Sequence, residues 1–126
     1  DDDTIVRVLE GSPQLCDVVL LNVGEAAVER TARLARLKKL VIFTDTLEGL
    51  QRLPDSLCDR SRLTLLRVSN PNMERLPESI GQLPSLEALD LRDCSNLYTL
   101  PESTGQLSSL ETLNLSACSF LYVLPE

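Results

Sequence analysis

The stretch LPESIGQLPSLEALDLRDCSNLYT, residues 76–99, is followed directly by LPESTGQLSSLETLNLSACSFLYV, residues 100–123. Identity runs through most of these two 24-residue segments, and residues 53–75 carry the same unit in a form one residue shorter. A repeat period of roughly 20–50 residues is typical of architectures in which each unit forms one coil of a stack. The chain is therefore expected to be a solenoid.

Each unit contains the pattern L-x-x-L-x-L, which predicts a short strand. The two clearest copies are Leu86, Leu89, Leu91 and Leu110, Leu113, Leu115. Looser copies start at Leu63, Leu37 and Leu15, so that successive starts are separated by 22, 26, 23 and 24 residues. The alternation in Leu89-Asp90-Leu91 sends the leucines to one face of a strand and Asp90 to the other.

The rest of each unit predicts a short helical turn on the opposite side. Proline opens this segment, and an acidic residue follows it at the end of the turn where backbone N–H groups are exposed. The acidic column consists of Asp55, Glu78, Glu102 and Glu126. The position of these acidic residues at the start of each helical turn explains the column better than a role in acid–base catalysis does. Gly81 and Gly105 are interpreted as permitting a tight return of the chain.

These periods predict an α/β fold, a leucine-rich-repeat solenoid of about five coils. Its concave face carries a short parallel sheet, and its convex face carries short helices or turns. Residues 1–36 are interpreted as an N-terminal cap with a degenerate first repeat, including a strand over Asp17–Val23 and helical character over Glu25–Lys39. Residues 37–126 form repeats of about 23–26 residues with an uncapped C-terminal end, which predicts either a fragment or self-association through that end.

Composition excludes several classes of function. Only 3% of the 126 residues are aromatic, so the core of this single domain is aliphatic. The net charge of −7 is divided into −6 over residues 1–29, +5 over residues 30–75 and −6 over residues 76–126. An acidic total disfavours nucleic-acid binding, which needs clustered cations. No apolar run is long enough to span a membrane.

The four cysteines fit the repeat better than they fit chemistry. Cys94 and Cys118 lie three residues past the last strand leucine, and Asn70 takes the matching place when the count runs back from Met73. Small polar side chains there can bond to backbone groups of neighbouring coils. Without histidine, a zinc site would need all four thiolates to converge, and Ser-His-Asp or Cys-His catalysis is impossible. We therefore expect reduced thiols, no metal, no cofactor and no enzymatic activity.

The motif LPESIGQLPSLEALDLRDCSNL resembles the cysteine-containing leucine-rich repeats of plant intracellular proteins. In particular, it is similar to the repeat region of nucleotide-binding leucine-rich-repeat disease-resistance receptors and related plant or moss repeat proteins. The resemblance implies a cytoplasmic array that senses ligands or restrains a receptor. It covers residues 53–126 well and residues 15–52 loosely. The phosphate-loop string GxxxxGK[ST] is absent, so any nucleotide switch would lie elsewhere.

Three columns of strand residues are predicted to face outward on the concave sheet. They are Asp17, Lys39, Leu65, Ala88 and Thr112; Val19, Val41, Arg67, Asp90 and Asn114; and Leu21, Phe43, Ser69, Arg92 and Ser116. The candidate protein-binding residues among them are Val41, Phe43, Leu65, Arg67, Ser69, Asp90, Arg92, Asn114 and Ser116. Val19, Leu21, Val41, Phe43 and Leu65 form an apolar patch. The alternatives are that the N-terminal segment covers this patch or that the register there is displaced by one residue.

Two functions compete on these grounds. The first is a non-catalytic protein-recognition module that binds a protein partner, or another domain of the same receptor, through the concave face. The second is a structural or autoinhibitory scaffold that contacts other domains or a second copy through its ends.

Overall fold

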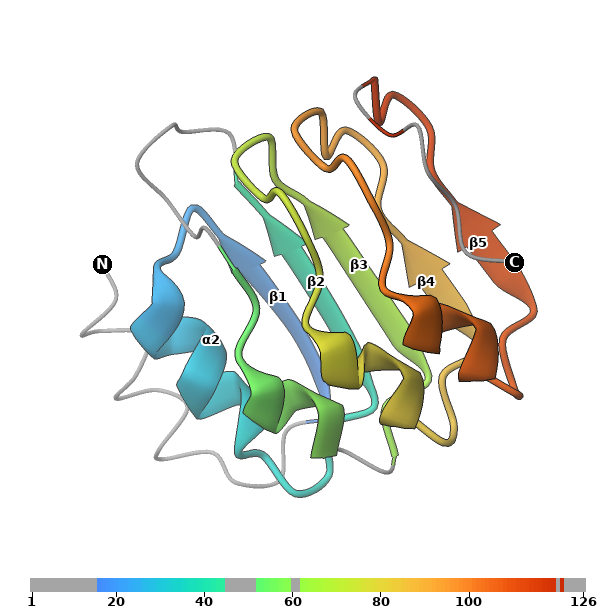
Figure 1. The fold of residues 1–126 in the computed structure, drawn as a ribbon. Coiled ribbons are helices and arrows are strands. Elements are labelled where there is room, and N and C mark those ends of the chain that lie inside the picture. Colours follow the sequence, from blue (N-terminus) through green and yellow to red (C-terminus); the bar gives the residue numbers. More distant parts are fainter. Residues whose placement is uncertain (1–15, 45–51, 60–61, 120, 122–126) are drawn as a thin grey trace.

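Five short strands build the sheet of this protein in a computed structural model that describes residues 16–44, 52–59, 62–119 and 121. The strands are β1 (Asp17–Leu21), β2 (Lys39–Phe43), β3 (Leu65–Ser69), β4 (Ala88–Asp90) and β5 (Thr112–Asn114). All four neighbouring pairs are parallel, and the order in the sheet is the order in the chain (Figure 1). This arrangement confirms the predicted leucine-rich-repeat solenoid.

The strand register is the predicted one. Asp17 pairs with Lys39, Lys39 with Leu65, and the same column continues through Ala88 to Thr112. The leucine pattern fixes this alignment because a slip of one residue would turn every inward side chain toward solvent.

Four helical segments stack along the other side of the sheet (Figure 1). They are the α-helix α2 (Glu25–Ala32) and the 3₁₀ turns η1 (Asp55–Asp59), η2 (Glu78–Gln82) and η3 (Glu102–Gln106). Each 3₁₀ turn begins at a residue of the predicted acidic column, directly after a proline.

Two predicted boundaries in the first coil are wrong. Helical character was expected as far as Lys39, but α2 ends at Ala32, where the amide of Arg33 closes the last turn on the Arg30 carbonyl at 3.2 Å. The chain needs the following residues to return to the sheet, since β2 already begins at Lys39. The first strand ends at Leu21 rather than Val23, whose side chain is buried.

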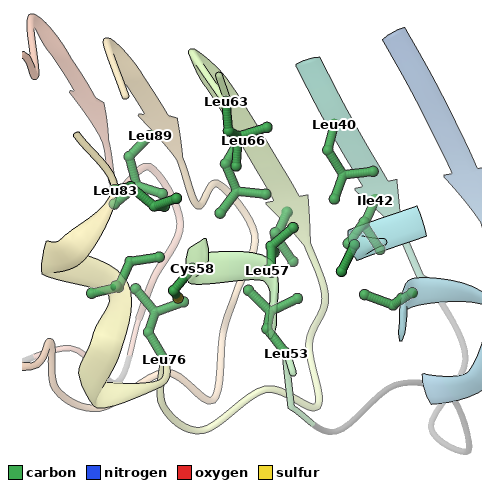
Figure 2. Packing of buried hydrophobic residues seen from close by; sticks show 14 of the residues in the cluster. Leu40, Ile42, Leu53, Leu57, Cys58, Leu63, Leu66, Leu76, Leu83 and Leu89 are labelled. Carbon is green, nitrogen blue, oxygen red and sulfur yellow. The ribbon is translucent and has the colours of Figure 1, made fainter. Parts of the chain in front are cut away.

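The core is a layer of aliphatic side chains between the sheet and the helical segments (Figure 2). Leu40, Leu66 and Leu89 enter it from successive strands, and Leu57 and Leu83 enter it from the convex side. All five are essentially fully buried. Burial of each leucine contributes about 1.5–3 kcal/mol, so the free energy of folding comes mainly from this spine.

The predicted turn column is confirmed for its two cysteines by their hydrogen bonds. The thiol of Cys94 donates to the carbonyl of Val68 at 3.2 Å, and that of Cys118 donates to the carbonyl of Leu91 at 3.0 Å. Each bond joins one coil to the coil before it. Desolvation by burial raises the pKa of the Cys94 thiol to about 12, which keeps it protonated and able to donate.

Candidate functional site

The concave side of the sheet carries the side chains that alternate with the buried leucines. At its β1–β2 end, Val19, Leu21 and Phe43 are 64%, 62% and 44% exposed, whereas Val18 and Leu20 are buried. The register is therefore not displaced in this part of the chain, and that alternative is wrong. Whether the N-terminal segment covers the apolar patch is not addressed, because residues 1–15 lie outside the described residues.

Next to the apolar patch, Arg67, Asp90 and Arg92 form a charged cluster. Arg92 holds the carboxylate of Asp90 with both its Nε and Nη2 atoms, at 3.0 Å from Oδ1 and 2.7 Å from Oδ2. The Nε atom of Arg67 approaches Oδ2 from the neighbouring strand at 3.7 Å. One largely covered carboxylate is thus shared by two arginines that are each about 40% exposed, at 42% and 40%. The cluster presents positive charge to solvent.

The ionisation of Asp90 follows from these contacts. Desolvation by burial is the largest single influence and favours the protonated acid, but it is outweighed. The hydrogen bonds and charge of Arg92, with a smaller contribution from Arg67, hold the pKa of Asp90 below its ordinary value. The carboxylate is therefore charged throughout the physiological range.

Asp90 also has a structural task, which Asn114 repeats one coil later. The Oδ1 atom of Asp90 accepts the backbone N–H of Arg92 at 3.1 Å, and that of Asn114 accepts the N–H of Ser116 at 2.9 Å. Such side-chain acceptors fix the turn that follows a strand. An asparagine at position 90 would therefore preserve the fold while removing the charge.

One residue of the candidate site does not lie open on this face. Ser69 was expected to be exposed, but only 6% of it is accessible to solvent. The third repeat is one residue shorter than the fourth, and the chain turns inward at the fully buried Asn70. Ser69 directly precedes this turn, and its carbonyl accepts the amide of Thr44 at 2.8 Å.

The other candidate residues share the predicted face. Phe43 and Ser116 are exposed, and the remainder are partly exposed: Val41, Leu65, Arg67, Asp90, Arg92 and Asn114. Sequence columns could place these side chains side by side, but they could not reveal that Arg67 and Arg92 share one carboxylate. The only signal was the opposite charge of Asp90 relative to Arg67, its neighbour in the same column, and to Arg92 in the next column.

The described part of the chain contains no group of side chains arranged to hold a metal ion. There, no cluster of three or more carboxylate or cysteine side chains has the arrangement of a metal site. All four cysteines are free thiols, and Cys16 is the exposed one. None of the described helices is both long enough and apolar enough to cross a membrane.

The regular stack of coils, the buried leucine spine and the open parallel sheet define a leucine-rich-repeat solenoid. A comparison with protein families identifies a particular family of leucine-rich repeats. The family model described as R13L1/DRL21 LRRs matches residues 20–118. The chain belongs to this family of leucine-rich repeats, and the resemblance to plant resistance-protein repeats is confirmed.

Two individual proteins are also similar. TMV resistance protein N of Nicotiana glutinosa is 47% identical over 45 residues, which is 36% of this chain and 4% of that protein. The chain thus matches a small part of a much longer relative. Among solved structures, the leucine-rich repeat domain of the type III effector XopL is 20% identical with a TM-score of 0.46, covering 98% of this chain and 67% of that one.

Proposed function

We propose that this chain is a protein-recognition module that binds a partner through its concave sheet. The observation that carries the proposal is the exposure of Val19, Leu21 and Phe43 beside the cluster of Arg67, Asp90 and Arg92. Contiguous exposed apolar side chains mark contact surfaces. A neighbouring charge cluster adds orientation and specificity to such a surface.

The family and the similarity to TMV resistance protein N support a more specific role. In this proposal, the chain is the ligand-sensing or regulatory repeat region of a plant-type intracellular resistance receptor and works in the cytoplasm. Its partner is a protein or another domain of the same receptor. It contributes binding rather than catalysis.

The test compares variants on the two faces of the solenoid. The first pair is Leu21→Ser with Phe43→Ser, and the second is Arg67→Glu with Arg92→Glu. Asp90→Asn is tested as a separate variant, because it removes the negative charge but keeps the side-chain oxygen that accepts the Arg92 amide. Each chain is immobilised, partners are captured from plant leaf extract, and the affinity for each captured protein is then measured.

Truncation of an interface hot spot costs about 2 kcal/mol or more, so each concave pair is expected to weaken binding by at least about tenfold if it holds a hot spot. The matched control is Glu78→Lys with Glu102→Lys, two exposed positions on the convex side. Binding that survives both concave pairs but is lost in the convex control would contradict the proposal. That outcome would favour a scaffold that works through other surfaces.

A further inference from the structure

A basic hollow lies at the edge of the sheet where the strands begin. Its volume is about 450 Å³. The side chains that line it are Cys16, Arg36, Lys38, Arg62, Thr64 and Ser85. Three are cationic and two bear hydroxyl groups, and none of the described residues that line the hollow is a carboxylate. The lining comes from four successive coils, so the hollow is a product of stacking and not of one local motif.

The repeat itself does not require these bases. Arg36 and Arg62 lie three residues before the first residue of β2 and of β3. The same position before β4 and β5 is occupied by Ser85 and Ser109. The residue directly before the strand changes from Lys38 through Thr64 to glutamate in the last two coils. Since the later coils fold with serine and glutamate there, the positive charge of the earlier coils has no structural necessity.

No described carboxylate compensates the charge of the three cations. Among the residues that the structure describes, neither Arg36, Lys38 nor Arg62 takes part in an ion pair, in contrast to the arginines around Asp90. Like charges gathered at one site repel one another, and binding an anion relieves that repulsion. The exposed side chains are free to close around a ligand.

Side chains, and not the backbone, must hold such an anion. The amides along this edge are already used: Thr64 donates to the carbonyl of Lys38, and Glu87 donates to that of Thr64, both at 2.8 Å. The Thr64 hydroxyl donates to the same Lys38 carbonyl at 3.2 Å. Two guanidinium groups and one ammonium group remain as donors toward the hollow.

We propose that the basic hollow binds a phosphate monoester, presented by a phosphorylated side chain of a protein partner. Two guanidinium forks match the oxygens of a phosphate, and three positive charges match a group that carries about 1.5–2 negative charges at neutral pH. A single carboxylate carries one negative charge and would neutralise only one of the three positive charges. That the phosphate belongs to a protein rests on the proposed function. Lys38 directly precedes β2, so a protein bound on the concave sheet would lie close to the hollow. Binding of phosphate itself does not depend on the proposed function.

The first experiment uses inorganic phosphate at constant ionic strength and follows backbone amide signals by NMR. Saturable shifts are expected at Lys38, Thr64 and Ser85. The test variant is Arg36→Ser with Arg62→Ser, which copies the serines of the later coils and should fold normally. Because the variant loses two guanidinium groups that donate charge-assisted hydrogen bonds, the affinity should fall roughly tenfold or more.

The matched control is Arg33→Ser with Arg52→Ser, which removes the same charge from exposed positions outside the hollow. An equal loss of phosphate binding in this control would show a general charge effect and overturn the proposal. Absence of saturable shifts in the unaltered protein would overturn it as well.

The second experiment identifies the source of the phosphate with a short neutral peptide carrying one phosphoserine. It should bind more tightly than inorganic phosphate, and much more tightly than the same peptide with serine or glutamate. Equal binding of glutamate peptide, or no gain over free phosphate, would contradict the phosphoprotein source. The variants Leu21→Ser with Phe43→Ser should leave phosphate binding unchanged, so failure of the concave-face proposal is separable from failure of this one.

Discussion

At the scale of single residues, Cys94 shows how a side chain can join two coils. Its position three residues past a strand leucine was enough to predict a turn role, because the same spacing recurs at Cys118. The partner could not be predicted from sequence, since it is a backbone carbonyl 26 residues earlier, at Val68. Burial and this hydrogen bond together make the thiol a structural donor.

This residue predicts a specific dependence of stability on pH. The pKa of the Cys94 thiol is raised from about 9.0 to about 12, with desolvation as the main cause. A raised pKa means that the contribution to stability is complete below pH 9 and is lost as the pH rises through the folded value. Above pH 9, the loss from this group is about 1.4 kcal/mol per pH unit.

The measurement is chemical unfolding of the unaltered chain and of Cys94→Ala between pH 8 and pH 11. The alanine variant should be less stable at pH 8 by about 1–2 kcal/mol, because a buried hydrogen bond and packing are lost. That difference should shrink above pH 9 and change sign before pH 11, because the unaltered chain loses about 1.4 kcal/mol per pH unit from this group and the variant does not. A difference that stays constant to pH 11 would contradict the predicted ionisation. As a second check, a thiol reagent at pH 8 should modify Cys16 but not Cys94 in the folded chain.

At the scale of elements, the convex turns η2 and η3 are joined through Gly81. The sequence suggested that this glycine permits a tight return of the chain, but no described glycine has a positive φ. Its actual role is close approach. A Cβ atom at Gly81 would overlap the backbone of Ser103, whose hydroxyl donates to the carbonyl of Glu78 at 2.6 Å and accepts the Gly81 amide at 3.3 Å.

Gly81→Ala should therefore separate two coils. Forcing an extra carbon into a well-packed contact costs about 1–3 kcal/mol, and here the obstacle is backbone that cannot rotate away. The matched control is Gly105→Ala, the exposed equivalent one coil later, which should change stability by less than about 1 kcal/mol. Thermal unfolding of both variants provides the measurement. Equal stability of the two variants would refute the close-approach role.

Element boundaries show where sequence patterns succeed and fail. The positions of β2 to β5 and their register could be predicted, because burial of leucine leaves one alignment that satisfies every coil. The end of α2 could not, because charged residues continue helical character into the segment that returns to β2. The exposure of Ser69 was misjudged for a similar reason: a one-residue deletion changes a turn without disturbing the leucine pattern.

At the scale of the whole molecule, the burial of one leucine column changes toward β5. Leu66, Leu89 and Leu113 hold one register position on successive strands. The first two are fully buried, but Leu113 is 43% exposed. In the sheet order, β5 has one neighbouring strand and β3 has two. Identical side chains in identical local geometry thus differ in energy because of their place in the stack.

Leu66→Ala and Leu113→Ala test this dependence in the 126-residue chain. Truncation of a fully buried leucine costs about 2–5 kcal/mol through lost burial and the remaining cavity. The change at Leu113 should cost clearly less, about 1 kcal/mol, because solvent already reaches that side chain. Urea unfolding gives both values. Equal losses would mean that β5 is covered in solution by something that the isolated chain does not show.

The domain division stays a prediction, although the family match from residue 20 to residue 118 crosses the boundary proposed at residue 36. The sequence could predict which residues align in columns on the concave side, but not how exposed each of their side chains is. Whether a side chain such as Val19 is open depends on everything around it, whereas its direction depends only on its own strand.

The repetition of residues 76–99 in residues 100–123, with 16 of 24 positions identical, has an evolutionary consequence. Because each unit offers the next the same leucines, carbonyl acceptors and turn donors, an in-frame duplication of one unit inserts a coil whose two interfaces are already matched. Such an event lengthens the sheet by one strand spacing, about 4.8 Å, and adds three new concave positions. Recombination between repeats can therefore vary the reach of the recognition surface in discrete steps, while leaving the existing apolar patch and basic hollow intact.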